Sequence, residues 1–267
     1  MRHLRELFDL RGRVAIVTGG AGHIGFAIAD ACAELGADIA IVDVDAGRAE
    51  ASAASLRSAR GVKALELAVD LEDESAVRAI PARVARELGG IDILVNCAAL
   101  VGTSGLTGWA VPLGDQETSS WRRALEVNLT APFVLAQASA DLLAARGRGS
   151  IVNVLSIYGL VGPDERLYEG TPLGNPAAYG ASKAGLLQLT RHLATTLAPS
   201  IRCNAITPGG VERGQADAFR DRYVARTPLR RMAIEEDFKG AAAFLASDAS
   251  AYVTGQNVVV DGGWTAW

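Results

Sequence analysis

Short, almost fully apolar runs rich in β-branched residues alternate along the chain with stretches of helical period. The runs cover residues 14–18, 39–42, 91–95, 151–155, 201–206 and 258–260. Unbroken apolar runs are typical of strands buried on both faces of a parallel sheet. The alternation of strand and helix predicts right-handed crossovers and helices on both faces. The expected fold class is therefore α/β, a single doubly wound domain with a mostly parallel sheet.

The helical stretches carry apolar residues three or four positions apart, which places them on one helix face. One stretch has Val77, Ile80, Val84 and Leu88, and Pro81 within it predicts a kink or a late start. Further helices are expected over residues 26–35 and 121–145, and around Leu186 to Leu197.

Three stretches fit neither period: residues 101–116, 159–176 and 209–232. Each follows the carboxyl end of a predicted strand, and ligands bind at that edge of open α/β sheets. Long irregular segments in a compact domain are often functional. No linker or change of composition divides the chain, so we expect one domain over residues 1–267, with residues 209–232 as a substrate loop.

Composition excludes several classes of protein. The 267 residues are 49% hydrophobic and 21% charged, which excludes intrinsic disorder. The net charge of −4 and the lack of a basic stripe argue against nucleic-acid binding. We expect no signal peptide, membrane span or metal cluster. Three widely spaced cysteines, Cys32, Cys97 and Cys203, indicate reduced thiols and a cytoplasmic protein.

A glycine-rich turn, Thr18-Gly19-Gly20-Ala21-Gly22-His23-Ile24-Gly25, joins the first strand to the next helix. Glycines let the backbone approach a pyrophosphate, and a helix N-terminus offers it free N–H groups. A strand before the turn and a helix after it are the context that this interpretation requires. Gly19, His23, Ile24 and Gly25 are therefore candidate dinucleotide contacts.

Asp43 ends the second predicted strand, 18 residues after Gly25. A carboxylate there can accept hydrogen bonds from the adenosine ribose and would repel a 2′-phosphate. Asp45 adds negative charge, and Arg48 is the only cation nearby in the sequence. NAD is therefore the expected cofactor rather than NADP.

Tyr179 and Lys183 are four residues apart, on one face of a helix. A nearby ammonium favours a phenolate, which would make the tyrosine a usable base. By itself this spacing is common and is more typical of an ordinary pair on a helix surface. Ser156, at the end of the strand over residues 151–155, could bind a substrate oxygen. Pro132 frees the Asn128 carbonyl from its helical hydrogen bond, so that it could hold a water.

Together these residues resemble the short-chain dehydrogenase/reductase family, from about Gly12 to Trp264. Asn128, Ser156, Tyr179 and Lys183 match its catalytic tetrad. The resemblance implies a seven-stranded Rossmann sheet, an adenine site at Asp70 and Leu71, and a nicotinamide site beside Pro208, Gly209 and Val211. Further matches are Asn96 after the fourth strand, and Asp261, Gly262 and Gly263 at the C-terminal strand.

The sequence departs from the family pattern at several positions. His23 replaces the middle glycine of the turn, and Cys97 and Ala99 replace the usual Asn and Gly. The segment Gly210-Val211-Glu212-Arg213 lacks the usual threonine that contacts the carboxamide. Ser156 and Tyr179 are 23 residues apart, which is longer than is common in the family.

The resemblance implies hydride transfer between NAD and a secondary alcohol or its ketone. Tyr179 would be the general base, Lys183 would depress its pKa and bind the nicotinamide ribose, Ser156 would bind the substrate oxygen, and Asn128 would hold a water.

Polar residues in the stretch 162–176 favour a hydroxyl-rich small-molecule substrate, namely a sugar, sugar acid or polyol. These are Asp164, Glu165, Arg166, Tyr168, Glu169, Thr171 and Asn175. A 3-oxoacyl-thioester reductase, which would need a basic dock for an acyl carrier, is the alternative. A dinucleotide sensor without turnover is a third possibility, but such proteins typically lose the Tyr or Lys. Trp264 and Trp267, in an apolar tail, predict burial against a partner chain, and the family resemblance points to a homotetramer.

Overall fold

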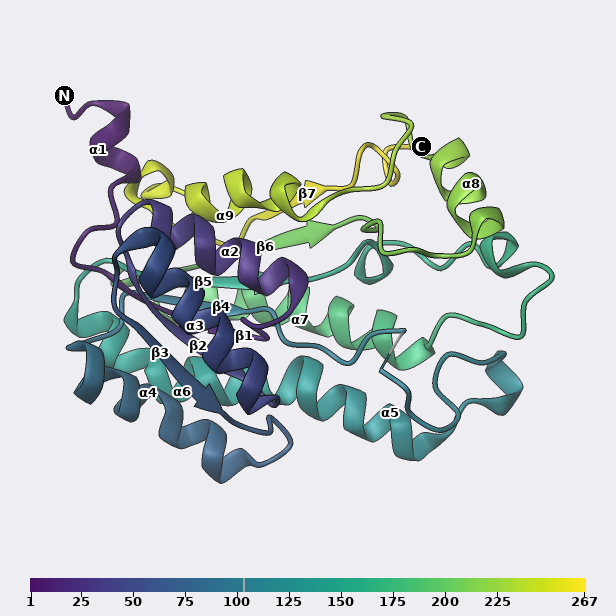
Figure 1. Cartoon of the computed structure of the whole chain (residues 1–267), viewed down its shortest axis with the longest axis horizontal. Helices are drawn as coiled ribbons and strands as arrows, with labels where there is room; N and C mark the ends of the chain where they lie inside the picture. The colour runs from purple at the N-terminus through teal and green to yellow at the C-terminus, as the bar shows by residue number, and fades with distance from the viewer. Residues whose placement is uncertain (103) are drawn as a thin grey trace.

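Seven strands form one parallel sheet in the order β3-β2-β1-β4-β5-β6-β7 (Figure 1). The computed structural model describes residues 1–102 and 104–267; residue 103, within the first irregular stretch, lies outside the described residues. The strands are β1 (Val14–Thr18), β2 (Asp38–Asp43), β3 (Ala64–Ala68), β4 (Ile93–Asn96), β5 (Gly149–Val154), β6 (Ile201–Pro208) and β7 (Asn257–Val260). The apolar runs predicted every strand except β3, an edge strand that is only partly buried and includes Glu66.

Helices cover both faces of the sheet because alternate strand residues point to opposite sides. The helices are α1 (Leu4–Phe8), α2 (His23–Glu34), α3 (Ala46–Arg60), α4 (Glu74–Leu88), α5 (Thr118–Leu125), α6 (Ala131–Ala145), α7 (Ala177–Thr196), α8 (Asp217–Arg226) and α9 (Lys239–Ala246). Ala15 and Val17 pack in one core with α2, α3 and α9. Val14 and Ile16 pack in the other with α4, α6 and α7. The doubly wound α/β prediction is confirmed (Figure 1).

The helix predicted over residues 121–145 is divided in two. Between α5 and α6 lies a π-helical turn, Glu126–Thr130, in which the Ala131 N–H donates to the Glu126 carbonyl five residues back. The physical reason is Pro132, which has no N–H to offer the Asn128 carbonyl. The whole run Thr118–Ala145 has the length and hydropathy of a candidate membrane span, but half of its most apolar window is buried inside the protein.

Two other helix predictions need correction. The helix after the glycine-rich turn begins at His23, three residues earlier than expected. The stretch around Pro81 does not start late: α4 begins at Glu74, because the Asp73 carboxylate caps it by accepting the Ala76 N–H at 3.1 Å.

Trp264 was expected in an exposed tail, and that prediction is wrong. Its side chain is fully buried within the chain itself. The indole stacks on Tyr223, with ring centroids 5.8 Å apart, and the Arg226 guanidinium lies 4.2 Å from its ring. Trp267, in contrast, is exposed. Gly262, Gly263 and Trp264 follow β7 and thus form a turn that packs against α8. They are not a free apolar end.

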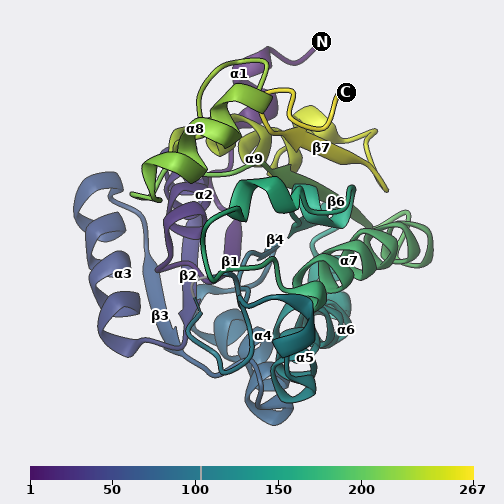
Figure 2. The same ribbon diagram turned by 90° about the vertical axis from the view of Figure 1, so that its right-hand side faces the viewer.

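The three irregular stretches gather at the carboxyl edge of the sheet. Figure 2 looks onto this edge, where α8, the segment after β5 and the segment before α5 surround the strand ends. The segment after β6 pairs with the chain before α9 through a single parallel bridge between Val211 and Ala233. The carboxyl edge is therefore framed by loops from three separate parts of the chain.

Candidate active site

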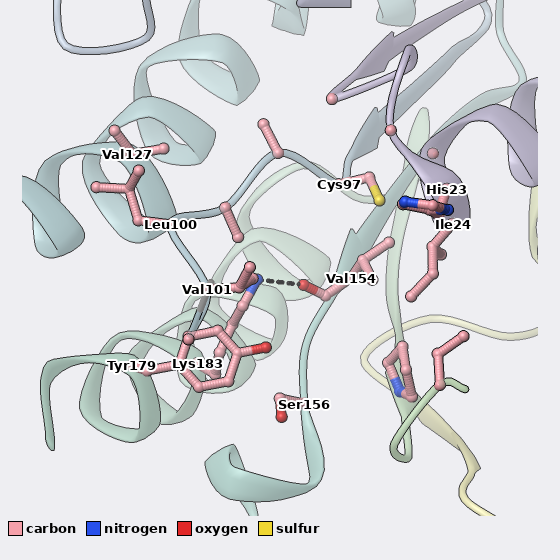
Figure 3. A pocket seen from close by; sticks show the side chains of 18 of the residues that line it. His23, Ile24, Cys97, Leu100, Val101, Val127, Val154, Ser156, Tyr179 and Lys183 are labelled. Atoms are coloured by element: carbon pink, nitrogen blue, oxygen red, sulfur yellow. Dashed lines mark hydrogen bonds between the residues drawn. The ribbon is translucent and has the colours of Figure 1, made fainter. Parts of the chain in front are cut away.

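A cavity of about 910 Å³ opens at this edge and reaches from the glycine-rich turn to α7. It is lined by most of the residues expected from the sequence: Gly19, His23, Ile24, Gly25, Asp43, Asp70, Leu71, Ser156, Tyr179, Lys183, Pro208, Gly209 and Val211. Asn96 and Asn128 are fully buried nearby and are not among the described lining residues. Figure 3 shows Ser156, Tyr179 and Lys183 on one side of the cavity and His23 and Ile24 across from them.

The glycine-rich turn fits a pyrophosphate because its backbone leaves no room for side chains. A Cβ on Gly25 would lie 2.1 Å from the Gly19 carbonyl oxygen, and one on Gly19, whose φ is +63°, would lie 2.8 Å from Ala98 Cα. Gly22 caps α2 with no side chain to accept its first N–H groups. These groups face the cavity mouth, where an anion can accept them.

The end of β2 offers a carboxylate to a ribose. Asp43 accepts the backbone N–H groups of Ala21 and Asp45, at 3.2 and 3.3 Å, and still borders the cavity. Arg48 also lines this end, where its guanidinium donates to the Ala21 carbonyl at 2.7 Å. A carboxylate so placed can bind two vicinal hydroxyls and disfavours a phosphate.

Ser156, Tyr179 and Lys183 meet at the other end of the cavity. Ser156 follows β5, and Tyr179 and Lys183 lie one turn apart on α7. The Lys183 ammonium donates to the Val154 carbonyl at 2.8 Å and lies 5.9 Å from the centre of the Tyr179 ring (Figure 3). Burial lowers the pKa of Lys183 to about 8.

The chain by itself does not lower the pKa of Tyr179, contrary to the expectation from the sequence. Burial raises this pKa, and the Ser156 hydroxyl and the Arg213 charge oppose the increase. The Lys183 ammonium is directed at a carbonyl rather than at the phenol, and it is not among the causes of the shift. A further positive charge near the phenol is needed to favour the phenolate at neutral pH.

Asn96 and Asn128 act inside the fold rather than at the cavity surface. Asn128 accepts the Leu100 N–H at 2.7 Å and donates to Ser182 on α7 at 3.1 Å. Asn96 donates to Asn153 of β5 at 2.8 Å. Asn128 therefore ties the π-helical turn to the chain after β4 and to α7, while its carbonyl is the group that Pro132 frees.

The polar residues of the stretch 162–176 do not line the cavity, with the exception of Tyr168. Asp164 instead pairs with Arg166 at 2.8 Å and with Arg226 of α8, and these hydrogen bonds hold the pKa of its carboxyl below the usual range. Asn175 donates to the Tyr168 hydroxyl at 3.1 Å. These side chains therefore do not support the inference of a hydroxyl-rich ligand, because apart from Tyr168 they are not among the described residues that line the cavity.

Sequence reasoning missed the apolar wall of the cavity. Its members are Tyr158, Tyr168, Phe219, Tyr223 and Met232. Phe219 packs between Tyr168 and Tyr223, with ring centroids 5.6 and 6.2 Å away. The only signal in the sequence was that four of the five members lie in the stretches 159–176 and 209–232, which fit neither period; Tyr158 lies just before the first of them.

The chain is similar to known proteins in sequence and in fold. A family model described as enoyl-(acyl carrier protein) reductase matches residues 19–265. Cis-4-hydroxycyclohexanecarboxylate dehydrogenase of Sinomonas cyclohexanicum is 40% identical over 95% of this chain and 97% of its own length. D-threitol dehydrogenase of Mycolicibacterium smegmatis is 38% identical, over 97% and 95%.

The crystal structure of a gluconate 5-dehydrogenase from Burkholderia cenocepacia, in complex with NADP and tartrate, superposes with a TM-score of 0.88. It is 33% identical and is matched over 99% of this chain and 100% of that one. The chain belongs to the short-chain dehydrogenase/reductase family. It is an oxidoreductase that acts on CH–OH groups. Turnover, rather than sensing alone, is therefore the activity to explain.

The geometry of this short-chain dehydrogenase supports acid–base catalysis at Tyr179. Bound in the cavity, the nicotinamide dinucleotide supplies the hydride acceptor and a positively charged ring. The Ser156 hydroxyl, at the end of β5, is placed to hold the substrate oxygen. In this arrangement the Tyr179 oxygen would take the hydroxyl proton. Lys183 would bind the nicotinamide ribose, and the Asn128 carbonyl that Pro132 frees would accept a hydrogen bond from a water.

Tyr179→Phe tests the base. The ring and its packing remain, but the ionisable oxygen is lost. We expect turnover to fall by at least about 100-fold, the usual range for a positioned acid–base group. The affinity for the cofactor should stay near its wild-type value, because Asp43 and the glycine-rich turn are unchanged. Steady-state rates and cofactor titration measure both. Near-normal turnover with bound cofactor would show that Tyr179 is not the base.

Lys183→Met separates function from stability. A folded pKa of about 8 against 10.5 in the unfolded chain means that the charged lysine destabilises the fold below pH 8. That cost, on the order of 3 kcal/mol, disappears as the pH rises from 8 to 10.5. It exceeds the ~1 kcal/mol of the hydrogen bond to Val154.

The Lys183→Met variant should therefore lose activity and cofactor affinity, yet melt no lower than the unchanged protein at pH 7 in the absence of cofactor. Its advantage should vanish towards pH 10.5. Thermal unfolding across this pH range is the measurement. A melting temperature several degrees lower at pH 7 would contradict the assignment of a net destabilising charge.

Proposed function

We propose that this protein is an NAD-preferring dehydrogenase that oxidises a secondary hydroxyl of a small hydroxylated substrate. The single observation that carries the cofactor preference is Asp43, whose carboxylate lies at the end of β2 on the cavity wall. The related gluconate 5-dehydrogenase structure holds NADP, so the family alone does not decide the preference. Arg48 is engaged with the Ala21 carbonyl, which supports a ribose rather than a 2′-phosphate beside Asp43.

Asp43→Ala tests the preference. The unchanged protein should show a higher kcat/KM with NAD than with NADP, because a carboxylate repels the 2′-phosphate. Removing the carboxylate should narrow the ratio by about tenfold or more, since close like charges cost several kcal/mol. Asp45→Ala is the comparison variant: this neighbouring carboxylate caps α3 and is not among the described residues that line the cavity, so its removal should change the ratio less than Asp43→Ala does. A wild-type preference for NADP would refute the proposal.

The substrate is best described as a sugar, sugar acid, polyol or related cyclic alcohol. Support comes from the names of the relatives, which act on threitol, gluconate and a hydroxycyclohexane carboxylate. The cavity adds a second argument. Ser156 and Tyr179 are polar at one end, and Tyr158, Phe219 and Tyr223 offer aromatic surface at the side. A ring with one apolar face and one oxidisable hydroxyl fits both walls.

The alternative, reduction of an acyl thioester on a carrier protein, needs a free basic surface. Three arginines of α8 and the segment after it are engaged within the chain. Arg222 donates to the Glu169 carbonyl at 2.8 Å, Arg226 pairs with Asp164, and Arg231 pairs with Asp237 at 2.7 Å. These contacts disfavour a dock for an acidic carrier.

A substrate panel tests this proposal. NADH formation should be detected with one or more of D-threitol, gluconate, xylitol, galactose and cis-4-hydroxycyclohexanecarboxylate. Cyclic substrates should show the lower KM, because they can pack on the aromatic wall. A Phe219→Ala variant should raise that KM more than the KM for a linear polyol. Activity confined to 3-oxoacyl thioesters would favour the alternative.

Assembly as a homotetramer is also part of the proposal. β7 forms one edge of the sheet, and Val259, Tyr252 and Trp267 expose apolar surface near the C-terminal end. Exposed apolar groups of this kind invite a partner, and closed two-fold assemblies are common. Light scattering at micromolar concentration should give a mass near four chains, whereas a monomer would refute this. A cytoplasmic location, suggested by three free thiols, stays a prediction.

A further inference from the structure

Two departures from the family pattern meet at one oxygen atom. His23 stands where the glycine-rich turn usually has its middle glycine, and Arg213 stands in the segment that lacks the usual threonine. Their side chains approach the same Glu235 carboxylate oxygen, His23 Nδ1 at 3.2 Å and Arg213 Nε at 3.6 Å. Residues 190 positions apart in the chain thus converge beside the first turn of α2, at the cavity edge.

The position of Glu235 is fixed because residues next to it in the chain form ion pairs with other parts of the protein. Lys239 pairs with Asp30 and Glu34 of α2, at 2.8 and 2.9 Å. Asp237, in the same turn, forms an ion pair with Arg231. On the opposite strand of chain, Glu212 donates its N–H to the Ala233 carbonyl at 2.9 Å. The backbone next to Arg213 is therefore hydrogen-bonded to the chain before α9, and this pairing holds Arg213 at the cavity edge.

The other basic side chains on the described cavity wall are engaged elsewhere. Arg48 donates to the Ala21 carbonyl at the ribose end, and Arg123 forms a two-pronged pair with Glu72. Lys183 donates to the Val154 carbonyl at 2.8 Å. Among the described residues, the Arg213 side chain has only the looser ionic contact with Glu235. Its guanidinium is free to take a stronger acceptor.

Arg213 also lies on the nicotinamide side of the cavity. It follows Pro208, Gly209 and Val211, which line that end. Burial raises the pKa of Tyr179 and of Cys97, and the charge of Arg213 is close enough to oppose both increases. Its contact with Glu235 places it next to His23 at the same time. A dinucleotide extended from Asp43 to Tyr179 would carry its pyrophosphate between these two regions.

We propose that Arg213 binds the pyrophosphate of the dinucleotide, at the phosphate nearer the nicotinamide. A planar guanidinium matches two phosphate oxygens, and the partly desolvated groove strengthens such a pair. The backbone N–H groups of the glycine-rich turn would then act on the pyrophosphate from one side and Arg213 from the other. The inference rests on the dinucleotide site of the proposed function.

Ligand fragments test this without turnover. ADP-ribose carries both phosphates, whereas AMP carries only the phosphate on the adenosine side. For Arg213→Met, calorimetric titration should show ADP-ribose affinity lowered about tenfold, the size expected for one charge-assisted hydrogen bond. AMP affinity should change by less than about twofold. Arg213→Lys, which keeps the charge, should recover part of the loss. Rising salt should weaken ADP-ribose binding more in the unchanged protein than in Arg213→Met.

Arg220→Met is the matched control, because this arginine pairs only with Asp217 and Asp221 on α8 and does not line the cavity. It should bind both ligands normally. Equal binding of ADP-ribose by Arg213→Met and the unchanged protein would overturn the proposal, as would an equal loss for AMP. Failure of the unchanged protein to bind ADP-ribose or NAD would instead overturn the cofactor assignment, and the Arg213 proposal with it.

Discussion

A buried row of polar side chains holds the strand ends and α7 in one register, and the active site depends on it. Asn96 of β4 donates to Asn153 of β5 at 2.8 Å, and Asn153 donates to Thr190 of α7 at 2.9 Å. On β1, Thr18 accepts the Cys97 N–H at 3.1 Å. Buried polar groups without partners are costly, so a shift of one strand would leave several of them unpaired. The row thus fixes where α7 presents Tyr179 and Lys183 relative to Ser156.

Electrostatics in the site follow from the same burial. The groups that handle the proton are removed from water, which raises the pKa of Tyr179 and lowers that of Lys183. Both pKa shifts favour the neutral forms. In the chain alone Tyr179 is a neutral phenol, and Lys183 loses its proton more readily than a free lysine does. A cationic ring nearby changes that balance in favour of the phenolate. With Tyr179 as the base, its strength would therefore depend on the bound oxidised cofactor.

Much of the site could be predicted because its signals are local. The glycine-rich turn, Asp43 and the Tyr179–Lys183 spacing each combine a residue type with a short-range backbone context. The sheet was predictable from apolar runs, except for the partly buried edge strand β3. The errors came from contacts across long sequence distances. Nothing near Asp164 in the sequence shows that Arg226 is its partner, and nothing near Trp264 shows that Tyr223 buries it.

Regular elements and irregular stretches both line the cavity, and this difference bears on substrate specificity. Strand ends and α7 supply the chemistry, whereas the aromatic wall comes from the irregular stretches after β5 and β6. That wall is one packed unit, because Tyr158 and Tyr223 both contact Trp264, with ring centroids 6.2 and 5.8 Å away. Residues in contact do not respond independently to substitution. A change of substrate in this chain should therefore require coordinated changes after β5, on α8 and after β7, while the proton-handling residues stay as they are.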